Sequence, residues 1–359
     1  MKKTTKKLMA FALAFAVQLN AAFVANADEN FDAEVSINAM NSYVEEVLPL
    51  YLSSRDLPYD NTYSFSSPFI INFTSFQNDS DYYYFVFQDN DVIGKILVSE
   101  ENGEFYSSFD MNVPKELQNY YDNSSDIYIS VEGDTTWVVS EDDCTPLENE
   151  SDVEYSGYRY QGSAIDKYET VDYSAPLLRR STQLADIKLS SFPTVRNEKV
   201  NGKYVLCWAA CIAMSVNYLQ DDNLTAMDVY KEIGSPAKPE GYSSNINKAF
   251  AAYNLSKTKY SSALTPNQVY QSLKNDKPVF VDVEATDKSM AHALEVFGIT
   301  ISNDKTVYTF MDPSILTGDA ARSVIATGNP STASTTFKYV HTYDGVSYTM
   351  TWRSAILIN

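Results

Sequence analysis

Three side chains in the second half of the sequence carry the groups that thiol-based acyl transfer needs: a thiol, an imidazole and a carboxylate. Cys207 stands directly before Trp208 in the run YVLCWAACIAMSVNYL, His292 lies in MAHALEVFG, and Asp312 lies in MDP. A cysteine attacks a carbonyl carbon as its thiolate, which a helix N-terminus and a nearby imidazolium both favour. The residues therefore predict a cysteine nucleophile, a distant histidine base and an acid that fixes the orientation of the histidine.

Helices are expected first and strands after them. The predicted helices cover Val205–Leu219, Thr225 to about Ile233, Ser243 or Ser244 to about Tyr253, and Thr265 through Leu273. The runs KPVFVDVEA, AHALEVFGITIS and TVYTFMDP predict successive strands, and Asp344-Gly345 predicts a hairpin near the C-terminus. This order indicates an α+β domain with helices packed on an antiparallel sheet.

The turn between two of these strands explains how His292 and Asp312 can meet. Ser302 to Lys305 is a polar turn, so antiparallel strands on either side of it bring Asp312 back toward His292. Asp304 is a weaker choice for the acid, because it lies in the turn at the far end of the hairpin. Asp-Pro is also an ordinary turn sequence.

Each of these residues also has a structural interpretation. A free cysteine such as Cys207 is often a small core residue, and a histidine such as His292 can be purely structural. Four further residues of reactive or aromatic type favour structural roles. We expect Cys211 to pack without a disulfide to Cys207, Trp208 to line the core or a pocket, and His341 to be structural, while Cys144 is a free thiol or pairs transiently with Cys207.

The first half of the sequence has a different character. Residues 1–27 combine four lysines, an apolar run and an Ala25-Asn26-Ala27 cleavage pattern, which predicts a secretory signal peptide rather than a membrane anchor. Residues 28–155 predict a small acidic α+β domain with a helix in Ala33–Tyr51. Its predicted strands are Phe69–Phe73, Tyr82–Phe87, Val92–Val98 and Ile127–Val131.

A polar stretch separates the two predicted domains. Residues 156–185 are expected to form a linker or processing region, in which Arg179-Arg180 is a candidate cleavage site, and residues 186–359 form the second domain. After the signal is removed, no later segment is apolar enough to span a membrane. The sequence thus predicts a protein released outside the cell.

Charge is distributed unevenly along the chain. Residues 28–180 contain 31 acidic and 7 basic residues, whereas residues 181–359 contain 16 of each. The absence of a basic patch argues against a nucleic-acid partner. Two separated histidines without a Cys-x-x-Cys pair do not predict a zinc site, and no glycine-rich phosphate loop occurs, so neither a metal nor a cofactor is expected.

Taken together, the motifs resemble those of the papain-like cysteine peptidases. The helix start Cys-Trp-Ala-Ala-Cys, the later Ala-His-Ala-Leu strand and the Asp-Pro acid are similar to a short bacterial branch of that superfamily. Thr265-Pro266 and Lys277-Pro278-Val279 also look like that branch. The resemblance covers roughly residues 190–320 and implies a papain-like catalytic domain, with Cys207 as nucleophile, His292 as general base and acid, and Asp312 as the orienting residue.

The resemblance has further implications. It implies a protein or peptide substrate and an N-terminal propeptide, here the acidic domain, that inhibits the enzyme before processing. The family places a glutamine about six residues before the cysteine as an oxyanion donor, but this chain has Asn201 there. Asn201 is therefore the predicted oxyanion residue, and its shorter side chain predicts weaker activity.

The main prediction is a secreted cysteine peptidase made as a zymogen. One alternative is acyl transfer by the same three residues, as in transglutamination or peptide ligation. Another is a secreted binding protein that keeps the fold without catalysis. The reaction products distinguish a peptidase from an acyl transferase. The reactivity of the Cys207 thiol distinguishes either enzyme from a binding protein.

Overall fold

The structure is a computed structural model of the 359-residue chain. It describes residues 39–57, 62–66, 69–73, 81–89, 91–101, 104–111, 113, 128–132, 135–139, 144–146, 185–285, 288–302, 305–315, 318–327, 338–343 and 346–359. The predicted signal peptide, the Arg179-Arg180 site and residues 156–184 of the predicted linker lie outside the described residues. Among the described helices, none is long and apolar enough to cross a membrane.

Four helices lie between residues 207 and 274. They are α3 (Cys207–Gln220), α4 (Ala226–Glu232), α5 (Ser243–Ala252) and α6 (Pro266–Lys274). Thr225 and Thr265 cap α4 and α6 through capping boxes, as predicted. The cap predicted at Ser243 or Ser244 is wrong, because α5 is preceded by Tyr242 in an extended conformation and its own backbone begins to turn at Ser243.

Antiparallel strands form the other layer of the C-terminal half. They are β9 (Ala185–Lys188), β12 (Lys257–Tyr260), β13 (Val279–Ala285), β14 (Ala291–Ile301), β15 (Lys305–Met311), β16 (Ala321–Thr327), β17 (Lys338–Tyr343) and β18 (Val346–Ile358). Their order is β12-β18-β13-β14-β15-β16, and β9 also pairs with β14. Tyr343 pairs with Val346, which confirms the predicted C-terminal hairpin.

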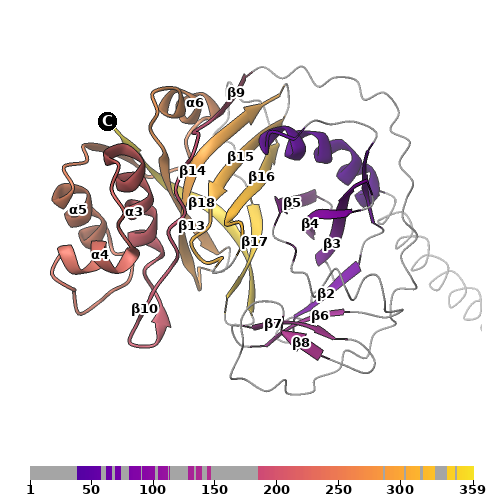
Figure 1. Ribbon diagram of the computed structural model, residues 1–359, viewed down its shortest axis with the longest axis horizontal. Helices are drawn as coiled ribbons and strands as arrows, with labels where there is room; N and C mark the ends of the chain where they lie inside the picture. The colour runs from indigo at the N-terminus through magenta and orange to yellow at the C-terminus, as the bar shows by residue number, and fades with distance from the viewer. Residues whose placement is uncertain are drawn as a thin grey trace, which may run out of the picture. The chain divides into compact units, whose positions relative to one another are not determined.

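Helices α3, α4 and α5 gather on one side of this sheet (Figure 1). The helix α3 packs against β14 and carries the longest continuous buried run of the described helices, from Trp208 to Val216. The predicted α+β arrangement of helices on an antiparallel sheet is confirmed for this half. A short hairpin of β10 (Lys199–Val200) and β11 (Lys203–Tyr204) precedes α3.

The N-terminal half begins with a helix at residues 39–54. Its strands are β1 (Tyr63–Phe65), β2 (Phe69–Phe73), β3 (Asp81–Gln88), β4 (Asp91–Glu101), β5 (Glu104–Asp110), β6 (Tyr128–Glu132), β7 (Thr135–Val139) and β8 (Cys144–Pro146). All pair antiparallel except β2 with β6. The four strands predicted in this half are present.

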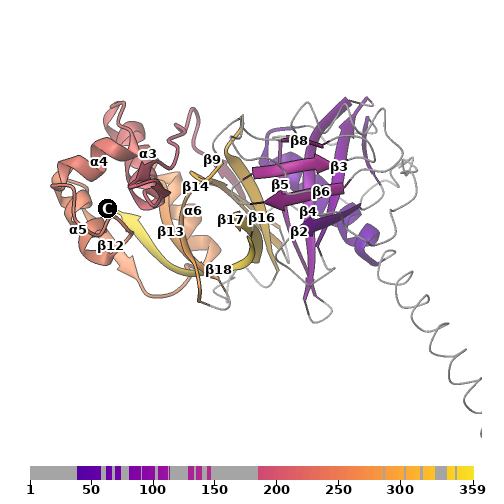
Figure 2. The same cartoon turned by 90° about the horizontal axis from the view of Figure 1, so that it is seen from below.

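One sheet runs through both halves of the chain, because β5 pairs antiparallel with β16 (Figure 2). Phe109 lies opposite Ser323, and Asp110 lies opposite Arg322. Residues from Val47 to Asn359 form one compact unit that contains this pairing. The strands that hold the candidate site are thereby flanked on one edge by N-terminal strands.

Candidate active site

Cys207 is the first residue of α3. The residue before it, Leu206, makes no side-chain cap, and the first turn contains no acidic side chain. The first N–H groups of a helix have no intrahelical partner, so this end of α3 presents a partial positive charge that stabilises an anion. The Cys207 side chain is half-buried and is not in a disulfide. Its position suits a thiolate that must still reach a substrate.

The segment before α3 is tied to the loop that carries the acid. The Leu206 N–H donates to Asn197 Oδ1 at 2.8 Å, and the Asn197 N–H donates to the Pro313 carbonyl at 2.7 Å. Pro313 follows Asp312 directly. These two bonds fix the start of α3 relative to the residues after β15.

His292 and Asp312 meet as the sequence predicted. His292 is the second residue of β14, Asp312 follows β15, and the pairing of Glu295 with Met311 places the two side by side. His292 Nε2 lies 2.8 Å from Asp312 Oδ1. The side chains are almost fully buried, since His292 is 3 % exposed and Asp312 is 0 % exposed.

The charge of the imidazole depends on both neighbours. Burial is the largest single effect and lowers the pKa of His292. The Asp312 charge, the hydrogen bonds to Asp312 and Cys207, and the Cys207 charge all raise it, and together they outweigh burial. The pKa of His292 therefore rises from 6.5 to about 10. Because Nε2 is used by Asp312, Nδ1 is the nitrogen left for the Cys207 thiol. Cys207, His292 and Asp312 thus form one hydrogen-bonded chain.

Asp312 is held on several sides. Its Oδ1 accepts from the Ser314 N–H at 3.0 Å and from the Ser314 hydroxyl, and its own N–H donates to the Ala320 carbonyl at 2.9 Å. Arg322 Nε lies 3.6 Å from Oδ2. The positive charge of Arg322 stabilises the carboxylate in this buried position.

The loop after Asp312 is braced by a second arginine. The Arg196 guanidinium donates to the carbonyl oxygens of Ile315 and Gly318, and the latter bond measures 2.5 Å. Burial lowers the pKa of Arg196, while the charges of Asp319 and Asp312 act in the opposite direction. Arg196 therefore fixes the acid loop through its backbone.

Asn201, the predicted oxyanion residue, lies at the tip of the β10–β11 hairpin. It has φ 54° and Gly202 has φ 81°, the backbone of a two-residue turn that asparagine and glycine favour. Its side chain is exposed. Its place in this structure is explained by the turn.

Asn197 is the amide that sequence reasoning missed. It is 6 % exposed, and its Oδ1 is bonded to the residue before Cys207. Among the described residues, no acceptor bonds its Nδ2, so a donor is available near the helix start. Counting six residues back from Cys207 leads to Asn201, which lies in the hairpin between Asn197 and α3. The Asn201-Gly202 turn was the signal in the sequence that could have drawn attention to Asn197.

Other expectations concerned structural residues. Cys211 is fully buried and free of a disulfide, and burial, followed by the charges of Glu295, Cys207 and Asp312, raises the pKa of its thiol. Trp208 is buried, and its indole N–H donates to the Pro239 carbonyl at 2.8 Å. Both predictions of packing are confirmed. His341 lies in β17 and Cys144 lies in β8, but their side chains are outside the described part.

Glu295 is a buried carboxyl that sequence reasoning did not single out. It is 0 % exposed, its Oε1 accepts from the Ser215 hydroxyl at 2.7 Å, and its Oε2 has no hydrogen-bond partner among the described residues. Burial raises the pKa of Glu295 well above its usual value, although the bond from Ser215 lowers it. The burial of Glu295 could not be predicted from the sequence, because a polar residue in a strand normally points to solvent.

Glu295→Gln is expected to become more stable than the wild type as the pH increases, because the wild type loses stability over this range. A carboxyl with a raised pKa in the folded state favours folding while it is protonated, and this contribution is lost as the pH rises above the unfolded value of 4.5. The loss is up to about 1.4 kcal/mol per pH unit. Glutamine keeps an acceptor for Ser215 and cannot ionise.

Denaturant unfolding at several pH values measures this effect. The variant should gain on the wild type between pH 5 and 8, and the gap should close near pH 4. Asp282→Asn is the comparison variant. Asp282 is less buried than Glu295, and burial raises its pKa as well. A gap for Glu295→Gln that is independent of pH would contradict the prediction.

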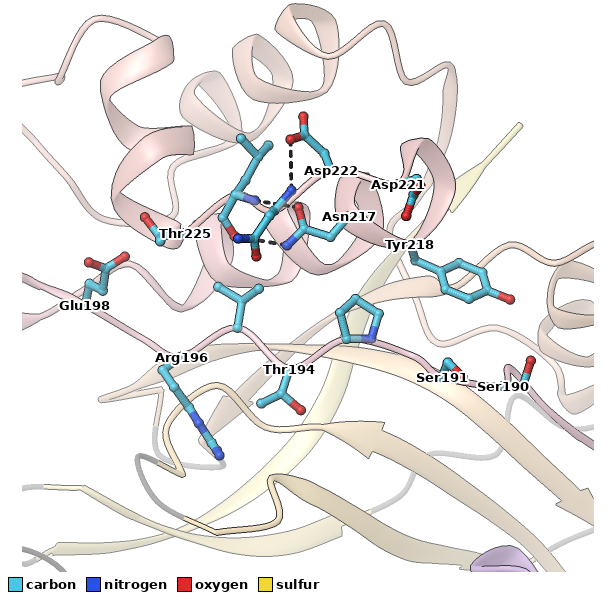
Figure 3. Close-up of a pocket in the computed structure, with 14 residues that line it drawn as sticks. Ser190, Ser191, Thr194, Arg196, Glu198, Asn217, Tyr218, Asp221, Asp222 and Thr225 are labelled. Atoms are coloured by element: carbon cyan, nitrogen blue, oxygen red, sulfur yellow. Dashed lines mark hydrogen bonds between the residues drawn. The ribbon is translucent and has the colours of Figure 1, made fainter.

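A polar hollow lies beside α3 but does not contain the three reactive residues (Figure 3). Two residues that line the hollow, Asn217 and Leu224, are joined by two hydrogen bonds. The Asn217 amide donates to the Leu224 carbonyl at 3.0 Å and accepts from the Leu224 N–H at 2.7 Å. Asp222 accepts from the N–H of Asn223 at 2.8 Å. These bonds serve the loop between α3 and α4, so the hollow is distinct from the candidate active site.

Comparison with known proteins agrees with the geometry. Residues 189–344 match the model of the Peptidase_C39 like family, a stretch that includes Cys207, His292 and Asp312. The match supports a papain-like cysteine-peptidase fold and a cysteine-peptidase type of enzyme. It covers less than half of the chain. No curated protein matches the sequence.

Proposed function

We propose that the chain is a secreted cysteine endopeptidase, made as a zymogen, that hydrolyses peptide bonds through Cys207, His292 and Asp312. The observation that supports this most directly is the hydrogen-bonded chain of the three side chains at the uncapped start of α3. An imidazole held between a carboxylate and a thiol is the arrangement that activates a cysteine, because the imidazole can take the thiol proton and the resulting imidazolium stabilises the thiolate. The family match is consistent with this chemistry.

The reaction begins with transfer of the Cys207 proton to His292 Nδ1. The thiolate then attacks the peptide carbonyl carbon, and the carbonyl π electrons move to oxygen, which gives a tetrahedral oxyanion. As the C–N bond breaks, His292 gives its proton to the departing amine and a thioester remains. Water attacks the thioester, His292 takes a proton from the water, and the carboxylic acid leaves as the thiol is restored.

Two donors are available for the oxyanion. One is the Cys207 N–H at the helix start, and the other is an asparagine amide. We propose Asn197 for the second donor, because its Oδ1 is already held beside Cys207 and its Nδ2 has no acceptor among the described residues. Asn201, the position matched by counting along the sequence, is the competing assignment.

Asn197→Ala is expected to lower kcat by about 10²–10³-fold, the cost of one oxyanion donor. Asn201→Gly is the matched control, since glycine accepts the φ of 54° at the hairpin turn. A peptide substrate with a fluorescent leaving group measures both variants. A large loss for Asn201→Gly with little loss for Asn197→Ala would reverse the assignment.

The zymogen proposal concerns the first half of the chain. We propose that residues 1–27 direct export, that the acidic domain of residues 28–155 inhibits the precursor, and that cleavage within residues 156–185 activates it. The charge difference between the halves supports separate roles. Arg179-Arg180 is a candidate site for that cleavage.

The test is mass spectrometry of the chain lacking residues 1–27, beside its Cys207→Ala variant. Trimming of the wild type within residues 145–195, with the variant intact, would support both peptidase and zymogen. Incubation with a mixed peptide library then identifies the products. New amine and carboxylate ends mean hydrolysis, whereas new isopeptide bonds would establish acyl transfer instead.

A precursor that does not trim itself is cut with an added protease and assayed again. Absence of activity would be followed by alkylation at about pH 6, where an activated thiolate reacts and an ordinary thiol hardly does. Slow alkylation of Cys207 in the cut protein would overturn the proposal in favour of a non-catalytic binding protein.

A further inference from the structure

The end of the first described helix contacts the strands next to the active site. Tyr51 is 0 % exposed and shares a hydrogen bond of 2.7 Å with Ser107 of β5. Ser54 is 4 % exposed and shares one of 2.8 Å with Ser323 of β16. The Ser323 hydroxyl also lies 3.2 Å from that of Thr309 in β15. A buried chain of hydroxyl groups therefore joins this helix to the catalytic sheet.

Main-chain pairing reinforces these contacts. β5 pairs with β16 from Ser108 to Asp110, and Val324 of β16 is fully buried. The ring of Phe109, also fully buried, stacks on Tyr51 with centroids 5.6 Å apart. The N-terminal strands thus cover the edge of β16 with hydrogen bonds and apolar side chains.

Arg55 extends this contact to the loop that carries the acid. Its guanidinium donates to the Ala321 carbonyl at 2.8 Å and pairs with the Asp319 carboxylate, and its side chain is only 7 % exposed. Asp319 in turn accepts from the Ala321 N–H at 2.9 Å. Between these two residues lies Ala320, whose carbonyl accepts from the Asp312 N–H at 2.9 Å.

We infer that the segment Val47–Asp110 is a permanent part of the active enzyme, which stays bound after the precursor is cut and positions Asp312 through Arg55. The inference rests on the proposed function. It limits the part of the precursor that cleavage can remove. Within the acidic domain of residues 28–155, the proposed inhibition is then confined to residues outside Val47–Asp110, and cleavage does not remove Val47–Asp110.

Release of the segment would be unfavourable for three physical reasons. It would leave the buried Ser323 hydroxyl without Ser54, one of its two partners. It would expose the edge of β16, a site where unpaired strands associate with other chains. It would also leave the Asp319 carboxylate without its arginine. A propeptide that must dissociate is not expected to be bound in this way.

Retention is tested on the Cys207→Ala chain without residues 1–27, with a site-specific protease sequence placed in residues 156–184. After a complete cut, native size-exclusion chromatography and intact-mass analysis follow the two fragments. We expect them to elute together in equal amounts. Elution of the C-terminal fragment as a folded species by itself would overturn the inference. This outcome does not depend on peptidase activity.

The positioning role is tested with three variants of the cut enzyme. Arg55→Ala is expected to lower kcat roughly 10- to 100-fold with little change in KM, because the substitution acts on the loop of Asp312 rather than on contacts with the substrate. Arg55→Lys keeps one positive charge and should recover part of the loss. Asp56→Asn is the matched control: it loses the neighbouring ion pair to Lys188 on β9, and asparagine accepts the φ of 59°.

Two readouts separate positioning from a general loss of stability. Asp312 raises the pKa of His292, so Arg55→Ala should move the alkaline limb of the kcat/KM profile to lower pH, and Asp56→Asn should not. The alkylation rate of Cys207 at about pH 6 should fall in parallel, and this rate needs no peptide substrate. Unchanged kcat and alkylation in a folded Arg55→Ala enzyme would overturn the inference. Rapid Arg55-dependent alkylation without peptide cleavage would overturn the proposed function alone.

Discussion

Cys207→Ala is expected to lower kcat/KM by about 10⁶-fold, the loss seen when a hydrolase loses its nucleophile. The other free cysteine among the described residues cannot replace the thiol, because Cys211 lies one helical turn away, is fully buried and has a raised pKa. Alanine is a favourable helix residue, so α3 should still form with its start at position 207. Thermal unfolding should therefore change little while activity disappears.

Cys211→Ala provides the matched comparison for this variant. It removes the other thiol of α3 from the core, which should lower stability by about 1 kcal/mol and leave most of the activity. Peptide hydrolysis and denaturant unfolding measure the two effects separately. Appreciable hydrolysis by purified Cys207→Ala, or none by a folded Cys211→Ala, would assign the nucleophile differently.

His292→Gln is expected to lower kcat/KM by about 10⁵–10⁶-fold, since it removes the group that both takes and returns the proton. Glutamine can still bond to Asp312, so the loop after β15 should keep its place. The imidazolium beside Cys207 disappears as well. Alkylation of Cys207 at about pH 6 should therefore slow to the rate of an ordinary thiol. His341→Gln removes the only other histidine and should leave both rates unchanged.

The His292→Gln substitution is also expected to change how the free energy of unfolding depends on pH. The pKa of His292 is raised from 6.5 to about 10, so the protonated side chain stabilises the folded state fully below pH 6.5. This contribution is lost as the pH rises toward 10. The wild-type advantage over His292→Gln in unfolding free energy should therefore shrink between pH 6.5 and 10. An advantage that grows over this range would contradict the assignment of a raised pKa.

Local pattern predicted the contact between His292 and Asp312 well. The alternation and turn chemistry of β14 and β15 placed Asp312 beside His292, because the register of two antiparallel strands follows from the short turn between them. The start of α3 at Cys207 followed from the change from an extended run to a buried helical one. Such features depend on neighbours in the sequence.

Features that depend on distant parts of the chain were not predictable. Asn197 was missed because a hairpin moves it toward Cys207 in space, and Glu295 because only the packing of Ser215 over β14 shows that it is buried. Arg55 lies in an acidic region of the sequence, and nothing in the residues around it predicts its contact with the acid loop. Its contact with the acid loop arises only when β5 joins β16.

The pairing of β5 with β16 also bears on the time at which activity can appear. Ser54 and Ser323, which meet beside this pairing, are 269 residues apart in the chain. Contacts over such separations form late in folding, because the intervening chain must first be ordered. The loop that holds Asp312 reaches its final support only at that step. The candidate active site is thus expected to be among the last regions to mature, so the proposed peptidase would be inactive in a nascent chain even before the proposed inhibitor acts on it.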